Sequence, residues 1–369
     1  MLVGTRKGAF VMRSDTSRRI WKLEGPHHFG CVVTHVVADP REPKVWLAAV
    51  KTGHLGPTVF RTSDAGKTWK EAKNPPAFPK APEGEQGRAV DTVFWLTPGG
   101  ADEPGVWWAG TNPHGLFRSE DGGETWTEVT ALSAYLASLD HSKEAFMPTP
   151  GGAITHSILV DPRDSAHLYV SMSVGGTFES RDRGATWKPM NKGVAIDYMP
   201  GQEFEYGQDP HCVVASPVNP DRLYQQNHCG IYRIDRPSNE WIRIGKNMPK
   251  AIGDIGFVIV THPRDADRVW VIPMDGTTVW PRTSIGGKPA VFGSDNAGRS
   301  WKRLDRGLPR ANAWHTVYRQ GFACDTAKPL GLYFGTSSGQ LWASRDEGGS
   351  WTKICEDLPA ILSVEIAAP

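Results

Sequence analysis

Short runs of hydrophobic residues alternate with polar turns along the chain, and each run has the length of one β-strand. The order is clearest in residues 154–189. There, four apolar runs are separated by turns rich in Asp, Pro, Gly and Ser, at 154–160, 167–171, 177–180 and 186–189. Residues 33–38 and 258–261 open in the same way. The pattern predicts repeated four-stranded units and an all-β fold.

An eight-residue motif follows the third run of five units. It reads Ser/Thr-x-Asp/Asn-x-Gly-x-Ser/Thr-Trp and occupies residues 62–69, 119–126, 180–187, 294–301 and 344–351. The Asp or Asn side chain can accept backbone N–H bonds in a tight turn, and the Gly permits a positive φ. The Trp buries a large ring beside the turn. Each copy therefore predicts a hairpin turn, and its carboxylate is interpreted as structural.

Two degenerate copies end at Trp21 and Trp241, which gives seven Trp positions separated by 48 to 61 residues. Units of this period built from strands indicate propeller blades. The chain starts with three strands, at 2–5, 9–13 and 20–23, and ends with a single strand at 361–367. We expect this last strand to complete the N-terminal blade. The sequence thus predicts an all-β, seven-bladed β-propeller, with four-stranded blades and residues 1–369 in a single domain.

Composition limits the function classes. The chain has 41 Lys and Arg against 40 Asp and Glu, a net charge of +1, so no nucleic acid or anionic membrane is expected as a partner. It contains no apolar stretch that could span a bilayer and no signal-peptide core near Met1, so a cytoplasmic location is expected. Five widely spaced cysteines predict free thiols.

Propeller geometry sorts the loops between two ends of the ring. The turn motifs and the Asp-Pro-Arg turns should share one end, here called the turn end. The loops between blades and the turns after second strands should share the top face, here called the mouth end. The mouth-end loops are long, at 75–88, 131–152, 194–210 and 276–290, and long loops on a rigid scaffold often carry function. Helical spacing of apolar residues within 131–146 predicts a short lid helix.

Titratable residues concentrate at the predicted mouth end. His156, His211 and His315 begin first strands, and His228 sits in a turn after a second strand. We expect them to converge as catalytic residues together with three loop residues, Glu205, Tyr206 and Asp275. Further residues of this end are candidates for ligand binding: Lys7, Lys51, His54, Arg88, Asp91, His114 and Glu203.

Three chemistries remain open for this cluster: metal ligation, general acid–base catalysis by His or Tyr, and a carboxylate pair that also draws on Asp209. The sequence lacks short ligand spacings such as His-x-x-x-His, so neither a metal nor another cofactor is predicted. In a purely structural interpretation, the first-strand histidines join neighbouring blades.

The five motif copies resemble the BNR or Asp-box repeat of sialidases, sortilin-type receptors, xyloglucanases and a photosystem assembly factor. Residues 3–10, 333–336 and 358–364 are similar to segments of bacterial soluble propellers described as exo-α-sialidase-like or glycosyl-hydrolase-like. The resemblance implies the propeller fold and supports a carbohydrate-active enzyme. True sialidases have six blades and an Arg-Ile-Pro motif that is absent here, so sialidase activity is not expected.

Two function classes follow. The first is an enzyme acting on a carbohydrate or similar polar small molecule at the top face, by hydrolysis or lyase-type elimination. The alternative is a non-catalytic propeller that binds a protein or a small ligand. The cluster of titratable residues favours the enzyme.

Overall fold

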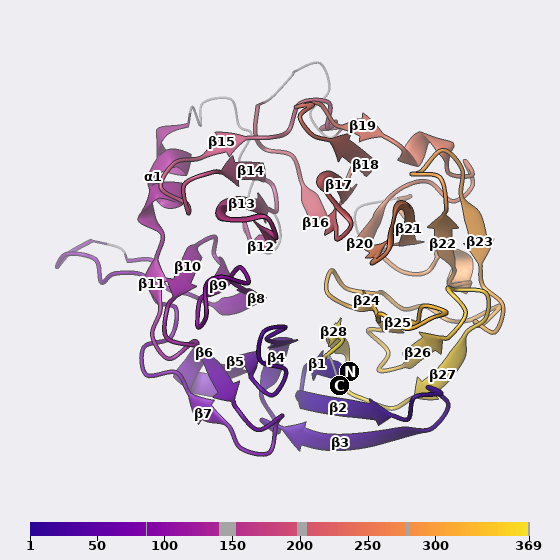
Figure 1. Cartoon of the computed structure of the whole chain (residues 1–369), viewed down its shortest axis with the longest axis horizontal. Coiled ribbons are helices and arrows are strands. Elements are labelled where there is room, and N and C mark those ends of the chain that lie inside the picture. Colours follow the sequence, from indigo (N-terminus) through magenta and orange to yellow (C-terminus); the bar gives the residue numbers. More distant parts are fainter. Residues whose placement is uncertain (86, 140–152, 198–204, 278–280, 368–369) are drawn as a thin grey trace.

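The computed structural model describes residues 1–85, 87–139, 153–197, 205–277 and 281–367. In these ranges seven antiparallel sheets of four strands stand around a common axis, as Figure 1 shows. The all-β, seven-bladed propeller predicted from the sequence is confirmed. In each blade the strand nearest the axis is the first listed below for that blade.

The first three blades have these strands. Blade 1 contains β28 (Ile361–Glu365), β1 (Leu2–Thr5), β2 (Gly8–Ser14) and β3 (Trp21–His27). Blade 2 contains β4 (Val32–Ala38), β5 (Trp46–Thr52), β6 (Gly56–Thr62) and β7 (Lys70–Glu71). Blade 3 contains β8 (Thr92–Pro98), β9 (Trp107–Asn112), β10 (Leu116–Ser119) and β11 (Thr127–Glu128).

The other four blades repeat the order. Blade 4 contains β12 (Thr155–Asp161), β13 (Asp164–Met172), β14 (Gly176–Ser180) and β15 (Lys188–Pro189). Blade 5 contains β16 (Pro210–Ser216), β17 (Asn219–Asn227), β18 (Gly230–Asp235) and β19 (Ile242–Arg243). Blade 6 contains β20 (Gly256–His262), β21 (Asp265–Pro273), β22 (Val291–Ser294) and β23 (Lys302–Leu304). Blade 7 contains β24 (Phe322–Cys324), β25 (Leu332–Gly335), β26 (Leu341–Ser344) and β27 (Thr352–Cys355).

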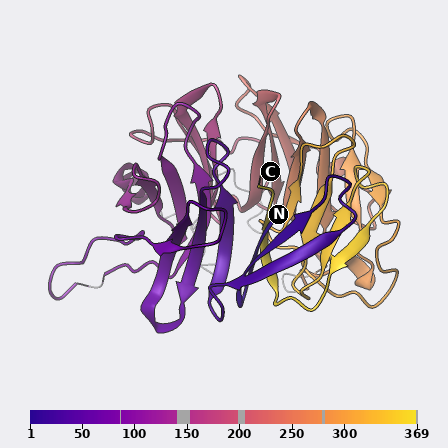
Figure 2. The same ribbon diagram turned by 60° about the horizontal axis from the view of Figure 1, so that its bottom comes forward.

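The ring closes in blade 1, where β28 pairs antiparallel with β1 and brings the two ends of the chain together (Figure 2). Val3 lies opposite Val364, and both side chains are fully buried. A Cβ at Gly4 would come within 2.5 Å of the Ser363 hydroxyl, so this close approach requires glycine. The predicted pairing of the C-terminal and N-terminal strands is confirmed.

All five motif copies form the same hydrogen-bonded turn. In the copy at 119–126, Asp121 accepts bonds from the Ser119 hydroxyl at 2.8 Å, from the Thr125 backbone at 2.9 Å and from the Thr125 hydroxyl at 2.6 Å. The backbone N–H of Gly123 donates to Ser119, and Gly123 has a φ of +90°. The equivalent backbone N–H bond is made to Asp64, Asp182, Asn296 and Asp346 in the other copies, and at Asn296 the side-chain amide donates to the Ser300 hydroxyl instead of accepting from it.

These turns bond to the turns between first and second strands, so both sets lie at the turn end. Ala65 N–H donates to the Lys44 carbonyl, and Arg183 N–H donates to the Ala166 carbonyl. Trp126 and Trp187 are buried, as are the Trp residues at 241 and 351. The other three motif positions, 21, 69 and 301, are half-buried, so the predicted burial holds fully for four of the seven.

The predicted lid helix begins as expected but does not cover the mouth. Helix α1 (Thr130–Ser138) lies at the outer edge of the ring (Figures 1 and 2). Leu132 and Leu136 pack into an apolar cluster with Phe178 and Trp187 of blade 4. Within the described ranges, single-turn 3-10 helices occur at Gly53–Leu55, Gly245–Asn247 and Ile285–Gly287. Across the described ranges, no helix is both long and apolar enough to cross a membrane.

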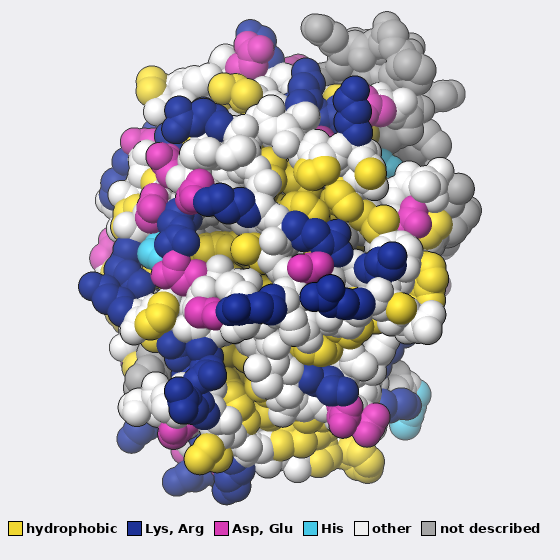
Figure 3. All heavy atoms as spheres, turned by 90° about the vertical axis from the view of Figure 1, so that its right-hand side faces the viewer, with side chains coloured by type: hydrophobic (Ala, Val, Ile, Leu, Met, Phe, Trp, Pro, Cys, Tyr) yellow, Lys and Arg dark blue, Asp and Glu magenta, His cyan; other side chains and the backbone are white. Residues whose placement is uncertain are grey.

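The outer side formed by blades 6 and 7 is rich in Lys and Arg, with acidic side chains beside them (Figure 3). Lys302 pairs with Asp295 and Arg303 with Asp305, each at 2.7 Å. These ion pairs neutralise part of the positive charge. A cavity of about 240 Å³ beside them is largely apolar and is lined by Ile252, Pro273, Ile285, Gly286, Lys288, Ala290, Phe292 and Arg303. All five cysteines are free, as predicted.

Candidate functional site

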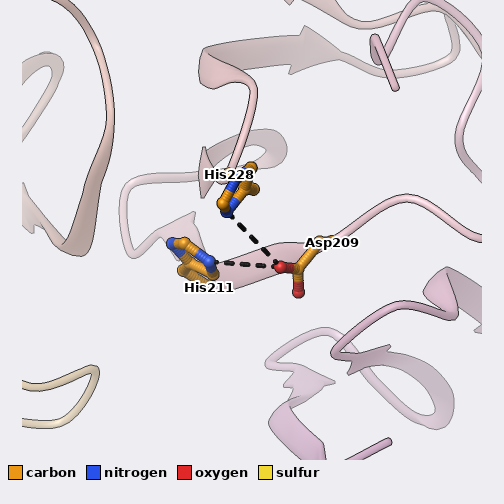
Figure 4. Close-up of side chains that lie close together, drawn as sticks. All are labelled: Asp209, His211 and His228. Carbon is orange, nitrogen blue, oxygen red and sulfur yellow. Dashed lines mark ion pairs between the residues drawn. The ribbon is translucent and has the colours of Figure 1, made fainter. Parts of the chain in front are cut away.

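The axial cluster consists of Asp209, His211 and His228, which meet where blade 5 reaches the mouth end (Figure 4). Asp209 and His211 flank Pro210 at the start of β16, where the pairing with β17 shifts register between Pro210 and Cys212. His228 follows β17, and its backbone N–H donates to the Asp209 carbonyl at 2.9 Å. The pairing of β16 with β17 therefore brings Asp209, His211 and His228 together.

One carboxylate oxygen faces both imidazoles. Oδ2 of Asp209 lies 3.4 Å from Nε2 of His211 and 3.7 Å from Nδ1 of His228. The other oxygen, Oδ1, accepts a bond from the Val174 N–H at 3.2 Å. On the far side of its ring, His211 Nδ1 lies 2.6 Å from the Gly256 carbonyl of β20. Because a carbonyl only accepts, Nδ1 carries a proton, and Nε2 is the nitrogen that faces the carboxylate.

The surrounding charges keep Asp209 ionised. Burial alone would raise the pKa of this carboxyl, but His211, Arg319 and His228 outweigh burial and lower it. Burial is the main cause of the lowered pKa of His228, with His211 adding to it. The His228 side chain is 23 % exposed, against 3 % for His211, so His228 is the member of the cluster that solvent reaches most easily.

Arg319 and Arg282 supply positive charge next to the cluster. Their guanidinium carbons lie 5.2 Å and 5.8 Å from the ring centre of Phe257, which also packs at 4.7 Å against His211. Burial lowers the pKa of Arg319, and Asp209 counteracts that effect. Arg319 also donates to the Ser173 hydroxyl at 3.1 Å, which carries it from blade 7 across the ring to blade 4.

Gln320, the next residue, spans the ring as well. Its side-chain N–H donates to the Phe94 carbonyl of blade 3 at 2.6 Å, and its backbone carbonyl accepts from Val364 of β28 at 2.7 Å. Neither Arg319 nor Gln320 is among the candidates from sequence. Their position just before an innermost strand, like that of His211, is the one signal that could have identified them.

His156 lies in the wall behind the cluster. It is fully buried, and its two ring nitrogens lie 2.9 Å from the Ser157 hydroxyl and 3.0 Å from the Pro210 carbonyl of the next blade. Burial holds its pKa well below the usual value, with Arg319 contributing. His156 therefore joins blades 4 and 5, which is the role that the structural interpretation assigned to first-strand histidines.

Tyr206 and Glu205 do not belong to the cluster. Tyr206 is buried in the apolar cluster of α1 and blade 4, with Leu132 and Leu136, and is not one of the three residues of the axial cluster. Glu205 is exposed, and its backbone carbonyl accepts from Asn191. Burial in this apolar cluster stabilises the Tyr206 ring.

Asp275 and His315 take part in local structure. Asp275 accepts from the backbone and hydroxyl of Thr277, at 3.0 Å and 2.7 Å, within its own loop. His315 is buried, and burial lowers its pKa to about 4. Its backbone carbonyl accepts from Ser284. Of the seven predicted catalytic residues, His211 and His228 belong to the axial cluster. Its third member, Asp209, is predicted from the sequence to lie at the mouth end and is a candidate for a carboxylate pair.

Four of the candidate ligand-binding residues contact one another in two pairs, Lys51 with Asp91 and Arg88 with His114. Lys51 binds Asp91 at 2.6 Å between blades 2 and 3. Arg88 donates to the His114 backbone carbonyl and stacks 4.0 Å above the Phe78 ring. Lys7 and His54 are exposed. Glu203 lies outside the described residues.

Comparison with known proteins gives relatives among carbohydrate-active enzymes. No family model matches the chain. The oligoxyloglucan-reducing end-specific xyloglucanase of Emericella nidulans is 29 % identical over 86 % of this chain, and a xyloglucanase of Paenibacillus sp is 24 % identical over 55 %. The chain spans 38 % of the first relative and 21 % of the second, well under half of their length.

Solved structures share the fold at low identity. The GH74 xyloglucanase from Xanthomonas campestris superposes with a TM-score of 0.62 and 18 % identity, over 95 % of this chain and 51 % of that one. YCF48 bound to D1 peptide gives a TM-score of 0.51 and 15 % identity, over 88 % of this chain and 80 % of that one. At these identities the superpositions show a common propeller architecture.

Proposed function

We propose that this chain is a carbohydrate-active enzyme, a glycoside hydrolase or lyase, whose reaction takes place at the axial cluster. The observation that carries the proposal is the meeting of Asp209, His211 and His228 beside Arg319 at the mouth end. The similarity to xyloglucanases supports a carbohydrate as the substrate class.

The chemistry suited to this cluster is proton transfer next to a fixed positive charge. The lowered pKa of His228 favours its neutral form, which can accept a proton from the substrate. Asp209 remains ionised and holds the two imidazoles in place. Arg319 would stabilise negative charge that develops on a substrate oxygen.

Lyase-type elimination fits this arrangement better than hydrolysis by two carboxylates. Asp209 is the carboxylate of the cluster, whereas most glycoside hydrolases place a second acid across the bond that breaks. The other axial acid among the described contacts, Glu365, is 3.0 Å from His35 on a different side of the ring. A sugar bearing a carboxylate near Arg319 is therefore the preferred substrate.

The test is an activity screen with neutral xyloglucan oligosaccharides and uronate-containing oligosaccharides. Reducing-end release reports hydrolysis, and ultraviolet absorbance of an unsaturated product reports elimination. We expect elimination, and we expect His228→Gln to lower kcat by about 10²–10⁴-fold, the usual contribution of a general base. Because the pKa of His228 is lowered, its neutral form should persist, and activity should continue, below pH 6.5.

His54→Gln serves as the control, since His54, a ligand-binding candidate from the sequence, is exposed and is not one of the three residues of the axial cluster. Its kcat should equal that of the wild type, and both variants should keep the wild-type Tm. A wild-type chain that binds oligosaccharides without converting any of them would contradict the enzyme and support the non-catalytic alternative. Loss of activity in His54→Gln equal to that in His228→Gln would contradict the assignment to the cluster.

A further inference from the structure

The spacing inside the axial cluster suits ligands of one metal ion better than direct hydrogen bonds. Distances of 3.4 Å and 3.7 Å from Asp209 Oδ2 to the His211 and His228 nitrogens exceed the length of a strong hydrogen bond to a carboxylate, about 2.7–2.9 Å. One ligand atom from each residue lies within 4.8 Å of the other two. Ligands bonded to a tetrahedral ion at about 2.0–2.1 Å are about 3.3 Å apart.

We propose that Asp209, His211 and His228 bind one divalent transition-metal ion, with zinc as the preferred ion. The three ligand atoms converge from the start of β16 and the turn after β17, two neighbouring strands of one blade. Three protein ligands leave at least one position open, which is the pattern of reactive rather than structural zinc sites.

The ligands are oriented by neighbouring groups before any ion arrives. The Gly256 carbonyl fixes the His211 ring by accepting from Nδ1 and leaves Nε2 for the ion. The Val174 N–H occupies the second oxygen of Asp209, and the His228 backbone holds the Asp209 backbone. Such outer partners orient ligands in established metal sites and strengthen binding.

The charges nearby select the type of ion. Arg319 and Arg282 repel any cation, and Asp209 provides one negative charge against them. Mg²⁺ and Ca²⁺ depend on several oxygen ligands, which this cluster does not supply. Zinc and its neighbours bind imidazole nitrogen strongly, so they can overcome the repulsion.

This inference rests on ligand geometry and not on the proposed reaction. When bound, the ion would supply a water of lowered pKa as the base, and His228 would act as a ligand instead. Binding of metal is measured without any sugar. Zinc binding without conversion of any carbohydrate would support the metal site and contradict the proposed function. Activity without metal binding would contradict the metal site and support the proposed function.

The test is calorimetric titration of chelator-treated full chain with ZnCl₂, and in parallel with MgCl₂ and CaCl₂. We expect one zinc ion per chain, binding to Mg²⁺ or Ca²⁺ at least 100-fold weaker, and a rise in Tm with zinc, since a ligand of the folded state stabilises it. Asp209→Asn and His228→Gln should each weaken zinc binding at least tenfold. His54→Gln, the exposed control, should bind zinc like the wild type.

A second readout protects the test against variants that fail to fold. Cobalt bound to the wild-type chain should give the visible absorbance of a low-coordinate site with nitrogen ligands, and one equivalent of zinc should abolish it. Zinc binding that is unchanged in His228→Gln would overturn the proposal. So would a wild-type chain that binds less than one zinc ion, or cobalt with the spectrum of the free hexahydrated ion.

Discussion

The two ends of the ring differ in how strictly the blades repeat. At the turn end, five blades use the same hydrogen bonds around Asp or Asn, with distances that agree within a few tenths of an ångström. At the mouth end, His156 and His211 each stand second in an innermost strand, but their contacts differ. His156 faces the carbonyl of the next blade, whereas His211 faces both a carbonyl and a carboxylate. The repeated end therefore maintains the scaffold, and the variable end is where a specific site can arise.

The largest effect should come from opening the ring, on which both ends depend. Deleting residues 361–367 removes β28 and with it the buried side chains of Ile361 and Val364. The edge of β1 would be exposed and blade 1 would lose its axial strand. We expect a fall in Tm on the order of 10 °C or more by differential scanning calorimetry. An unchanged Tm would show that the ring is stable without closure.

Within a closed ring, the turn end should control stability without affecting binding. Trp126 is 7 % exposed and donates to the Gly123 carbonyl at 3.0 Å. Trp126→Ala should lower the free energy of unfolding by about 3–5 kcal/mol in urea denaturation. Trp301→Ala, at a half-buried position of the same motif, is the matched variant and should cost less. If folded Trp126→Ala bound zinc more weakly than the wild type, the turn end would affect binding as well as stability, and the proposed difference between the two ends would be wrong.

One group at each end should lose its stabilising contribution on acidification, and the two groups should do so in separate pH ranges. Burial lowers the pKa of His315 at the mouth end to about 4, so the unfolded chain binds its proton first and stability falls from pH 6.5 toward pH 4. At the turn end, Glu179 has a pKa of about 2, because His167, Arg236 and Arg181 outweigh the opposing effect of burial. Its contribution is complete above pH 4.5 and is lost as the pH falls toward 2.

Single variants assign each range. Glu179→Gln should remove about 3 kcal/mol of pH dependence below pH 4.5, and His315→Gln should flatten the range from 6.5 to 4 by a similar or smaller amount. The measurement is the free energy of unfolding in urea at closely spaced pH values. If Glu179→Gln removed the pH dependence of stability between 6.5 and 4, or His315→Gln removed it below 4.5, the assignment of these pH ranges to the two residues would be wrong.

The smallest effect on stability is expected from an exposed ion pair at the mouth end. Lys51 and Asp91 join blades 2 and 3 at 2.6 Å, but both side chains are well exposed to solvent. Lys51→Ala should change the free energy of unfolding by less than about 1 kcal/mol, and the change should shrink further in high salt. A larger loss that does not depend on salt would mean that this ion pair at the mouth end also stabilises the fold.

Local sequence was sufficient for the fold because the repeated turn is held by residues within eight positions of one another. Ser119, Asp121 and Thr125 bond to each other, so their spacing is itself the structural information. Ring closure followed from counting strands at the two ends. Both inferences use short-range patterns that recur, and recurrence reveals them even in a single sequence.

The site was harder to predict because its contacts join distant parts of the chain. Arg319 reaches Asp209 only through the closed ring, and no local motif marks it. Tyr206 is adjacent to Glu205 in sequence, but its ring packs outward against α1. His156 and His211 occupy equivalent positions in blades 4 and 5, yet only His211 has a carboxylate two residues before it. Strand position alone did not separate them.

The bonds of Arg319 and Gln320 have a mechanical consequence. Each connects the inner edge of blade 7 to a blade on the opposite side of the ring, at Ser173 and at Phe94, in the way that spokes connect a rim. A ring braced across its diameter resists radial expansion more than one held only by contacts between adjacent blades. The brace also obstructs the axis, so a molecule that reaches Asp209 from the mouth should leave by the same route.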